Sequence, residues 1–398
     1  MEMERCKETV LIVHNYYQIP GGEDTVVRNE KELLEEHGHK VILYTRNNSE
    51  LKVFSKGRKL LLPFTTIFNP RTYRDIKKIV RKEQVDVIHV HNTLNLISPA
   101  VYYAARTCRK PVVQTIHNFR LLCPGATFYR DGHICEDCVE KGLQCAVKHK
   151  CYRNSRMQTL ACAINLKVHR MTGIYRKIYY ICLTDFNREK LLQLPGLKPE
   201  QVYVKPNFIM EKGNELLGKE EREDFFLYAG RLDSLKGVPQ LLDTWIQMGE
   251  KAPKLILCGS GPLESWCRGT IEKHHLRTIE FRGQTPWEEV QKLMGKARAM
   301  ILPTQWYEGF PMTIVEAYSV GTPVIGPDMG NVGDLIEEGV TGWKYQTSSE
   351  ESIKQTIINA MRMPVNYNQI GELYKQRYSS ELNYQQLTNI YRIVQELL

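Results

Sequence analysis

Short apolar runs alternate with stretches of helical period through the first half of the chain. The turn Gly21-Gly22 separates the first run from a helical pattern at Thr25–His37, and the third run is followed by another at Pro99–Thr107. Buried strands that alternate with helices are typical of a parallel sheet covered on both faces. The predicted strands are Val10–Val13, Val41–Tyr44, Val85–Val90 and Val112–Ile116.

A second series of the same kind begins after Pro206-Asn207, and we expect a second α/β domain to start near residue 211. Leu382–Leu398 carries apolar residues at helical intervals and predicts a final helix that packs on the body of the protein. The strands predicted in the second series are Phe225–Ala229, Lys254–Cys258, Thr278–Phe281, Ala299–Pro303 and Pro323–Gly326.

Length and composition agree with two α/β domains. A chain of 398 residues is too long for one ordinary core. The charged N-terminus leads into an apolar run too short for a signal peptide, and no stretch approaches the roughly 20 apolar residues of a membrane span. We therefore expect a cytoplasmic protein whose 11 cysteines are thiols or metal ligands rather than disulfides.

Positive charge is concentrated in the first half. Residues 1–210 carry 34 Lys and Arg against 20 Asp and Glu, whereas residues 211–398 carry 20 against 25. Such an excess can attract a phosphorylated substrate, an anionic membrane surface or nucleic acid, and charge by itself does not choose among them.

The same dipeptide follows three of the predicted strands: His14-Asn15, His91-Asn92 and His117-Asn118. His and Asn are common cap and loop residues, so one such pair could be coincidental. Because the carboxyl ends of parallel strands lie along one edge of a sheet, where ligands bind in open α/β folds, three pairs favour a functional edge.

The segment Thr304–Ala317 carries the strongest chemical signal of the chain. Pro311 suits the first turn of a helix, whose free N–H groups and dipole can bind phosphate. Glu308 precedes that helix and Glu316 lies inside it. Two carboxylates on either side of an anion site suit the hydroxyl groups that flank a sugar diphosphate.

A second loop, Gly230–Gly237, follows the first strand of the second series. Arg231 offers a planar guanidinium and Lys236 a point charge, the two usual means of holding phosphate oxygens. A single basic residue is more often solvated surface, but this pair lies beside glycines at a strand end. We expect the two residues to clamp a diphosphate leaving group.

Together these motifs resemble the retaining glycosyltransferases of family 4, which have the two-lobed GT-B fold. The resemblance covers almost the whole chain and rests on the E-x7-E segment with an internal Gly-Phe-Pro, the Gly-Arg-Leu-x3-Lys-Gly loop, the Gly259–Pro262 turn and Gly21-Gly22. It implies two Rossmann-like domains facing across a cleft. The expected domains are 1–205 for the acceptor, with a Cys-rich insertion at about 123–151, and 206–375 for the donor, followed by a helix at 376–398 that packs on the body or back onto the first domain.

The resemblance also implies roles. Glu308 would lie against the transferred sugar, Glu316 would bind the ribose, and Arg231 and Lys236 would neutralise the departing phosphate without a catalytic metal. His117 would lie near the donor sugar. Asn118 stands where the family often has Asp, and this difference weakens any proposal that residue 118 acts as a base. The implied donor-binding residues are Gly21, Gly22, Arg231, Lys236, Gly283, Glu308, Gly309, Phe310, Pro311, Met312, Thr313, Ile314 and Glu316.

The implied reaction moves a sugar from a UDP- or GDP-linked donor to a glycan or lipid-linked acceptor with retention, in cell-surface polysaccharide or glycolipid synthesis. An epimerase or a soluble disaccharide-phosphate synthase would use the same fold. A nucleic-acid-binding protein is the alternative from another class, but the chain lacks a groove-reading motif or an aromatic platform, so we expect no nucleic-acid partner.

Two further features of the first half allow more than one interpretation. The cysteine cluster suits a structural zinc bound by a subset of its members, reduced thiols in a compact loop, or a redox site. Between Lys148 and Lys177 basic and apolar residues alternate, which suits a helix on an anionic membrane surface as well as a core-facing helix with a solvated basic side. The clustered cysteines are Cys123, Cys135, Cys138, Cys145 and Cys151.

Overall fold

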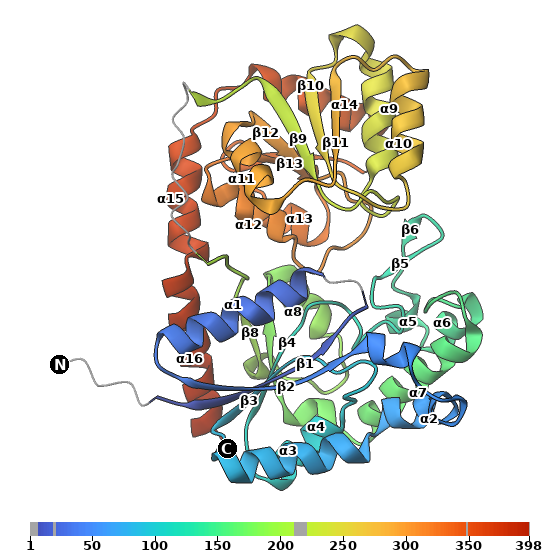
Figure 1. Cartoon of the computed structure of the whole chain (residues 1–398), viewed down its shortest axis with the longest axis vertical. Coiled ribbons are helices and arrows are strands. Elements are labelled where there is room, and N and C mark those ends of the chain that lie inside the picture. Colours follow the sequence, from blue (N-terminus) through green and yellow to red (C-terminus); the bar gives the residue numbers. More distant parts are fainter. Residues whose placement is uncertain (1–6, 19–20, 211–220, 348, 398) are drawn as a thin grey trace, which may run out of the picture. The chain divides into compact units, whose positions relative to one another are not determined.

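The computed structural model describes residues 7–18, 21–210, 221–347 and 349–397. The chain divides into two compact units (Figure 1). Unit 1 consists of residues 1–130, 135–210 and 380–398, and unit 2 of residues 131–134 and 211–379. The predicted start of the second domain near residue 211 lies outside the described residues.

Unit 1 is built on a six-stranded parallel sheet with the strand order β2-β1-β3-β4-β7-β8. Val10–Val13 lie in β1 and are completely buried, as expected for a strand that is covered on both faces. The predicted parallel sheet is thus confirmed. The strands are β1 (Thr9–Tyr16), β2 (Lys40–Asn47), β3 (Val87–Asn92), β4 (Val112–Thr115), β7 (Tyr179–Cys182) and β8 (Val202–Val204), and the short strands β5 (Tyr129–Arg130) and β6 (His133–Ile134) lie apart from this sheet.

The last helix of the chain packs in the core of unit 1. Leu387, Tyr391 and Val394 lie in the same buried cluster as Val10 of β1. Chain ends that are packed in this way contribute to the stability of the unit they join. The helices are α1 (Gly22–Glu36), α2 (Lys56–Ile67), α3 (Pro70–Glu83), α4 (Ala100–Thr107), α5 (Asp137–Glu140), α6 (Gln144–His149), α7 (Arg156–Met171), α8 (Asp185–Leu191) and α16 (Ser380–Glu396), with 3-10 turns η1 (Asn48–Lys52), η2 (Ile174–Lys177) and η3 (Pro199–Gln201).

Unit 2 repeats the architecture with a parallel sheet in the order β11-β10-β9-β12-β13-β14. Trp245 of α9 is fully buried in its core. The strands are β9 (Phe225–Ala229), β10 (Lys254–Cys258), β11 (Ile279–Gly283), β12 (Ala299–Ile301), β13 (Val324–Pro327) and β14 (Gly342–Tyr345). The helices are α9 (Val238–Met248), α10 (Glu264–Lys273), α11 (Trp287–Lys296), α12 (Met312–Ser319), α13 (Gly330–Leu335), α14 (Glu350–Arg362) and α15 (Tyr367–Tyr378), with the turn η5 (Gly249–Lys251).

Candidate functional site

Two loops at the carboxyl ends of β9 and β12 are held together by their backbones. Gln305 donates its backbone N–H to the carbonyl of Leu235 at 2.9 Å, and the Thr304 hydroxyl donates to the same carbonyl at 3.2 Å. Gly237 has a φ of +73°, and a Cβ atom there would lie 1.7 Å from the carbonyl oxygen of Pro303. Only glycine permits this approach, which places Lys236 beside the loop after β12.

Lys236 and Glu308, which the sequence predicts as site residues, contact each other. Lys236 Nζ lies 2.7 Å from Glu308 Oε1, and the same oxygen accepts hydrogen bonds from the Thr304 hydroxyl at 2.9 Å and Trp306 Nε1 at 3.1 Å. Glu308 is only 6% exposed. A carboxylate held by three donors has a defined orientation, and sequence reasoning did not identify Thr304 and Trp306, which provide two of them.

The backbone that follows Glu308 is also supported. Asn331 of α13 donates its side-chain amide to the carbonyls of Glu308 and Gly309, the latter at 2.8 Å. A single amide thus spans two successive peptide groups of the loop that precedes α12. Asn331 is fully buried and had no sequence signal, because it lies 22 residues after the loop that it holds.

Arg231 projects farther into solvent than Lys236. Its side chain is 54% exposed and pairs with Asp233, whose other oxygen accepts the backbone N–H of Lys236 at 2.9 Å. Asp233 therefore shapes the loop and restrains Arg231. An exposed guanidinium remains accessible to a ligand, although its pairing with Asp233 is worth little by itself in water.

Helix α12 begins at Met312, directly after Pro311, which confirms the helix start predicted from proline. The N-cap residue Pro311 carries no side-chain acceptor, so the first turn keeps donors that a ligand can use. Glu316 lies in the second turn, where Trp287 Nε1 donates to its Oε1 at 3.4 Å. Burial raises the pKa of the Glu316 carboxyl, and the Trp287 bond opposes that shift.

Glycines line the neighbouring strand ends of unit 2. Gly259 donates its N–H to the carbonyl of Gly283 at 2.6 Å, and Gly283 has a φ of +70°. A Cβ atom at Gly259 would lie 1.9 Å from the Gly230 carbonyl oxygen. The packing of the chain itself thus requires Gly259, whereas the left-handed conformation favours glycine at position 283.

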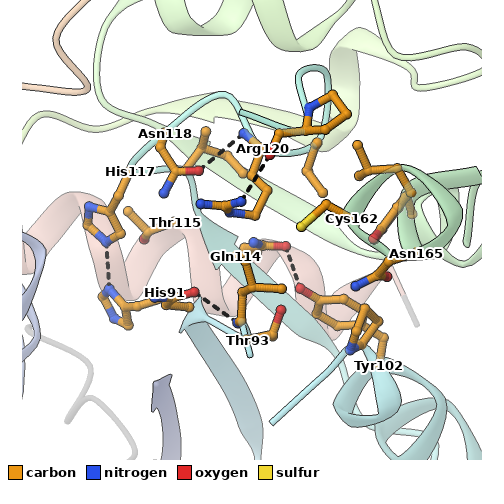
Figure 2. Close-up of a pocket in the computed structure, with 18 residues that line it drawn as sticks. His91, Thr93, Tyr102, Gln114, Thr115, His117, Asn118, Arg120, Cys162 and Asn165 are labelled. Carbon is orange, nitrogen blue, oxygen red and sulfur yellow. Dashed lines mark hydrogen bonds between the residues drawn. The ribbon is translucent and has the colours of Figure 1, made fainter. Parts of the chain in front are cut away.

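In unit 1, the three predicted His-Asn pairs do meet at one edge of the sheet. The His14 and His91 rings lie 6.2 Å apart, and His91 and His117 stack with Nδ1 of His91 3.0 Å from Nε2 of His117. Figure 2 shows the two stacked rings side by side. The expectation that these strand ends share an edge is confirmed.

A buried charged network lies behind His117. Glu30 of α1 is fully buried, with Oε2 3.2 Å from His91 Nε2 and Oε1 2.9 Å from Lys205 Nζ. Burial by itself would raise the pKa of Glu30, but Lys205, His89 and His91 hold it well below its usual value. Because a proton on His91 Nε2 would face the Glu30 carboxylate, we assign His91 Nδ1 as the acceptor of a hydrogen bond from His117 Nε2.

Burial lowers the pKa of His117 well below its usual value, and the neighbouring His91 lowers it further. His117 is therefore neutral near pH 7, with its free ring nitrogen Nδ1 as an acceptor. The group of Glu30, His89 and His91 is close enough to hold a metal ion. The Lys205 ammonium on Glu30 and the bonds of both His89 nitrogens, to Tyr391 and Thr115, instead indicate a polar network.

Gly21 precedes α1, and a Cβ atom there would meet nothing within 4 Å. The packing of the chain therefore does not itself require glycine at this position. Asp24 accepts the Gly21 N–H at 3.1 Å, and its other oxygen lies 2.8 Å from His14 Nε2. Burial and the nearby Asp24 raise the pKa of Glu23 to about 8, so this carboxyl in the first turn is largely uncharged at pH 7.

A cavity of about 50 Å³ adjoins His117 (Figure 2). It is lined by Arg120 and Asn165, whose atoms Nε and Oδ1 are buried without a hydrogen-bond partner among the described residues. This volume is large enough for several water molecules, each of which needs roughly 10–15 Å³. Apolar side chains such as Leu94, Ile116 and Leu166 also line the cavity, so its wall is mixed in character.

The five clustered cysteines form no disulfide among the described residues. Cys123 and Cys138 are hydrogen-bonded, and this bond lowers the pKa of Cys123 to about 6. Within the described part of the chain, no three of the five sulfur atoms come within 4.8 Å of one another, so the zinc site is not supported. The predicted zinc site can be tested by measuring the zinc content of protein purified without chelator. About one zinc ion per chain would support the site, and no zinc would contradict it.

Two Rossmann-like domains with polar and glycine-rich strand ends have the architecture of the GT-B fold. Residues 20–210 match the model of Glycosyltransferase Family 4, and residues 211–377 match the model of Glycosyl transferases group 1. The chain belongs to these glycosyltransferases, as the sequence motifs predicted.

Known relatives agree with this assignment. An uncharacterized glycosyltransferase of Methanocaldococcus jannaschii is 23% identical over 80% of this chain and 78% of its own length. The lipopolysaccharide outer core galactosyltransferase WaaB, in its apo form, has a TM-score of 0.65 at 17% identity, with 96% of this chain and 98% of that chain covered. HepE of Anabaena, solved with UDP, has a TM-score of 0.65 at 16% identity, with 96% and 99% covered. At these identities the solved structures show the fold.

Proposed function

We propose that the protein transfers a sugar from a UDP- or GDP-linked donor to a glycan or lipid-linked acceptor, with retention of anomeric configuration, in cell-surface polysaccharide or glycolipid synthesis. The contact of Lys236 with Glu308 beside the start of α12 is the observation that carries this proposal. It joins a cation, a restrained carboxylate and a helix N-terminus, the groups that a sugar diphosphate needs. The UDP-bound relative HepE and the lipopolysaccharide enzyme WaaB support a nucleotide-sugar donor and a glycolipid acceptor.

In this proposal the diphosphate binds to the first turn of α12, the backbone of Gly309–Ile314, and the side chains of Arg231 and Lys236. Lys236 then exchanges its contact with Glu308 for the phosphate as negative charge develops on the leaving group. No catalytic metal is required for that charge neutralisation. Glu308 is left to accept hydrogen bonds from the transferred sugar, and Glu316, oriented by Trp287, accepts them from the ribose.

Unit 1 would contribute Gly21, Gly22 and His117. The open space at Gly21 and the uncharged Glu23 favour the approach of an anion to the start of α1. Neutral His117 would accept a hydrogen bond from a sugar hydroxyl. The Glu30–His91 pair would act by positioning, because it determines which nitrogen of His117 carries the proton.

The proposal is tested by measuring transfer with a panel of UDP- and GDP-sugars. Lys236→Ala and Glu316→Ala are each expected to lower the rate at least about tenfold, as for the loss of one charge-stabilising contact. Lys273→Ala, at the exposed end of α10, is the matched control and should keep full activity. Full activity of both site variants would contradict the assignment.

Three further measurements separate the alternatives. Nucleoside diphosphate released only when an acceptor is present excludes an epimerase. A product whose anomeric configuration differs from that of the donor, determined by NMR, would contradict retention. Loss of transfer in a chelator, restored by a divalent cation, would contradict a metal-independent reaction.

A further inference from the structure

Large apolar side chains are exposed on and directly beside two helices of unit 1. Nine of the sixteen exposed large hydrophobic residues of the described chain fall within residues 53–68 and 157–171. Single exposed apolar residues are ordinary on any protein surface, but such a concentration marks an interaction site. The nine residues are Val53, Leu60, Leu61, Phe64, Phe68, Met157, Leu160, Ile164 and Met171.

Helix α2 contributes the most exposed part of this surface. Leu60, Leu61 and Phe64 are 77%, 57% and 70% exposed, and Thr66 is the one buried residue among the twelve of the helix. Most helices gain their stability by burying an apolar face. Among the described residues, nothing covers the exposed apolar face of α2.

Helix α7 lies beside α2 (Figure 1). Asn165 donates its side-chain amide to the Thr66 carbonyl at 3.2 Å, and a His169 ring nitrogen lies 2.9 Å from the Ile67 carbonyl oxygen. These bonds anchor the end of α2 on the buried side of α7. Met157, Leu160 and Ile164 lie at helical spacing on another, exposed side of α7 and are 82%, 46% and 41% exposed.

The two segments of sequence that carry these helices contain basic residues and no acidic ones. Residues 51–74 contain six Lys and Arg and no Asp or Glu, and residues 141–184 contain nine Lys and Arg and again no acidic residue. The exposed basic residues Lys56, Arg58 and Lys59 occupy the first turn of α2, directly before Leu60. A partner that covers this surface must therefore be anionic as well as apolar.

We propose that the exposed faces of α2 and α7 form a docking surface for an anionic lipid bilayer. Leu, Phe and Met side chains bordered by Lys and Arg are the composition of helices that lie in a membrane interface. A second copy is disfavoured, because a two-fold contact would bring equal sets of positive charge together. Nucleic acid has the required charge but would not bury exposed leucines and methionines. A single strand would instead stack its bases on aromatic side chains.

This arrangement is peripheral. Within the described residues, every helix is too short or too polar to cross a bilayer. The apolar face of α2 would enter the headgroup region while its basic first turn contacts lipid phosphates. This surface extends the proposed action on lipid-linked acceptors, but its nine exposed apolar residues are not among the proposed donor-binding residues, so vesicle binding and sugar transfer can fail independently.

The test is flotation of the full chain with vesicles of phosphatidylcholine, with and without phosphatidylglycerol. Binding is expected to be at least about tenfold stronger with phosphatidylglycerol and to weaken as salt screens the charge. The double variant Leu61→Ser and Phe64→Ser should lose at least about tenfold in binding to anionic vesicles, which corresponds to about 1.4 kcal/mol. Leu397→Ser is the matched control, because Leu397 is 61% exposed on the last turn of the chain, and it should bind as the wild type does.

Folding and activity controls complete the design. The double variant should keep the wild-type melting temperature and nucleoside diphosphate release with a water-soluble acceptor. Equal binding to both kinds of vesicle, or unchanged binding of the double variant, would overturn the proposal. A dimer in light scattering that the double variant converts to a monomer would assign this surface to contact between copies and would overturn it as well.

Discussion

Lys205 is a fully buried cation on which three segments of unit 1 converge. It follows β8 and donates through Nζ to Glu30 of α1 and to Asn383 of α16, both at 2.9 Å. Lys205→Met keeps an unbranched side chain but removes the ammonium group. The Glu30 carboxylate would then remain buried without its main counter-charge, beside His89 and His91 alone.

Loss of one partner from a buried ion pair costs about 3–5 kcal/mol, because the remaining charge is uncompensated. For a unit of this size, about 1 kcal/mol lowers the melting temperature by roughly 2–4 °C, so we expect a decrease of about 10 °C. Differential scanning calorimetry at pH 7 measures it. Lys254→Met is the matched control: its pair with Glu280 is 3.1 Å long but has side chains 50% and 38% exposed. An exposed pair is worth less than about 1 kcal/mol, which predicts a shift of about 3 °C or less.

The pH dependence separates a charge effect from a packing effect. Glu30 has a lowered pKa in the folded protein, so the stability it contributes is present above the ordinary carboxyl pKa and is lost as the pH falls through the folded value. In Lys205→Met the pKa of Glu30 rises, and its protonation relieves the burial cost. The difference between wild type and variant should therefore shrink on acidification, and the second substitution Glu30→Gln should restore part of the loss at pH 7.

A decrease of less than about 2 °C at pH 7, or an equal decrease in Lys254→Met, would refute this reasoning. An equal loss at pH 7 and pH 5 would assign the effect to packing rather than to charge.

Two other measurements follow from the structure. Burial lowers the pKa of His14, His89, His117 and His169, that of His89 to about 3, so the unfolded state binds more protons below pH 6.5. As the pH is lowered below 6.5, the free energy of unfolding should therefore decrease by about 1.4 kcal/mol per pH unit for each such histidine. A melting temperature that stays constant between pH 7 and pH 5 would contradict this. Gly237→Ala combines a positive φ with a clash against the Pro303 carbonyl, and it should cost at least about 2 kcal/mol and reduce transfer, whereas Gly269→Ala, with open space in α10, should stabilise slightly.

The sheets were predictable because continuous apolar runs identify strands that are buried on both faces. Phe225–Ala229 and Lys254–Cys258 agree with β9 and β10 at both ends. Helix α2 was not predicted, since its leucines are exposed and do not form the one-sided pattern that identifies a packed helix. The basic stretch predicted as one helix at Lys148–Lys177 is divided among the end of α6, the helix α7 and the turn η2.

Residues of the candidate site could be proposed from the sequence only where their chemistry is local in sequence. Glu308 and Lys236 lie in motifs with a recognisable spacing, and the His-Asn pairs follow visible strands. Their supporting partners come from distant segments: Asn331 from the helix after β13, and Glu30 from α1. An isolated buried Asn or Glu carries no pattern, because only the tertiary fold brings it to its partner.

The two units stabilise the same kind of sheet edge by different means. In unit 2, glycine allows two loops to touch through their backbones, and the resulting contact between Lys236 and Glu308 stays partly accessible, with 25% of the lysine side chain exposed. In unit 1, His117 is held from behind by a chain of side chains that ends at a fully buried Lys205. A partly accessible pair can exchange partners when a charged ligand binds, whereas a buried pair cannot do so without a large cost. We therefore expect ligand-dependent rearrangement of charge in unit 2 and a rigid, neutral acceptor at His117 in unit 1.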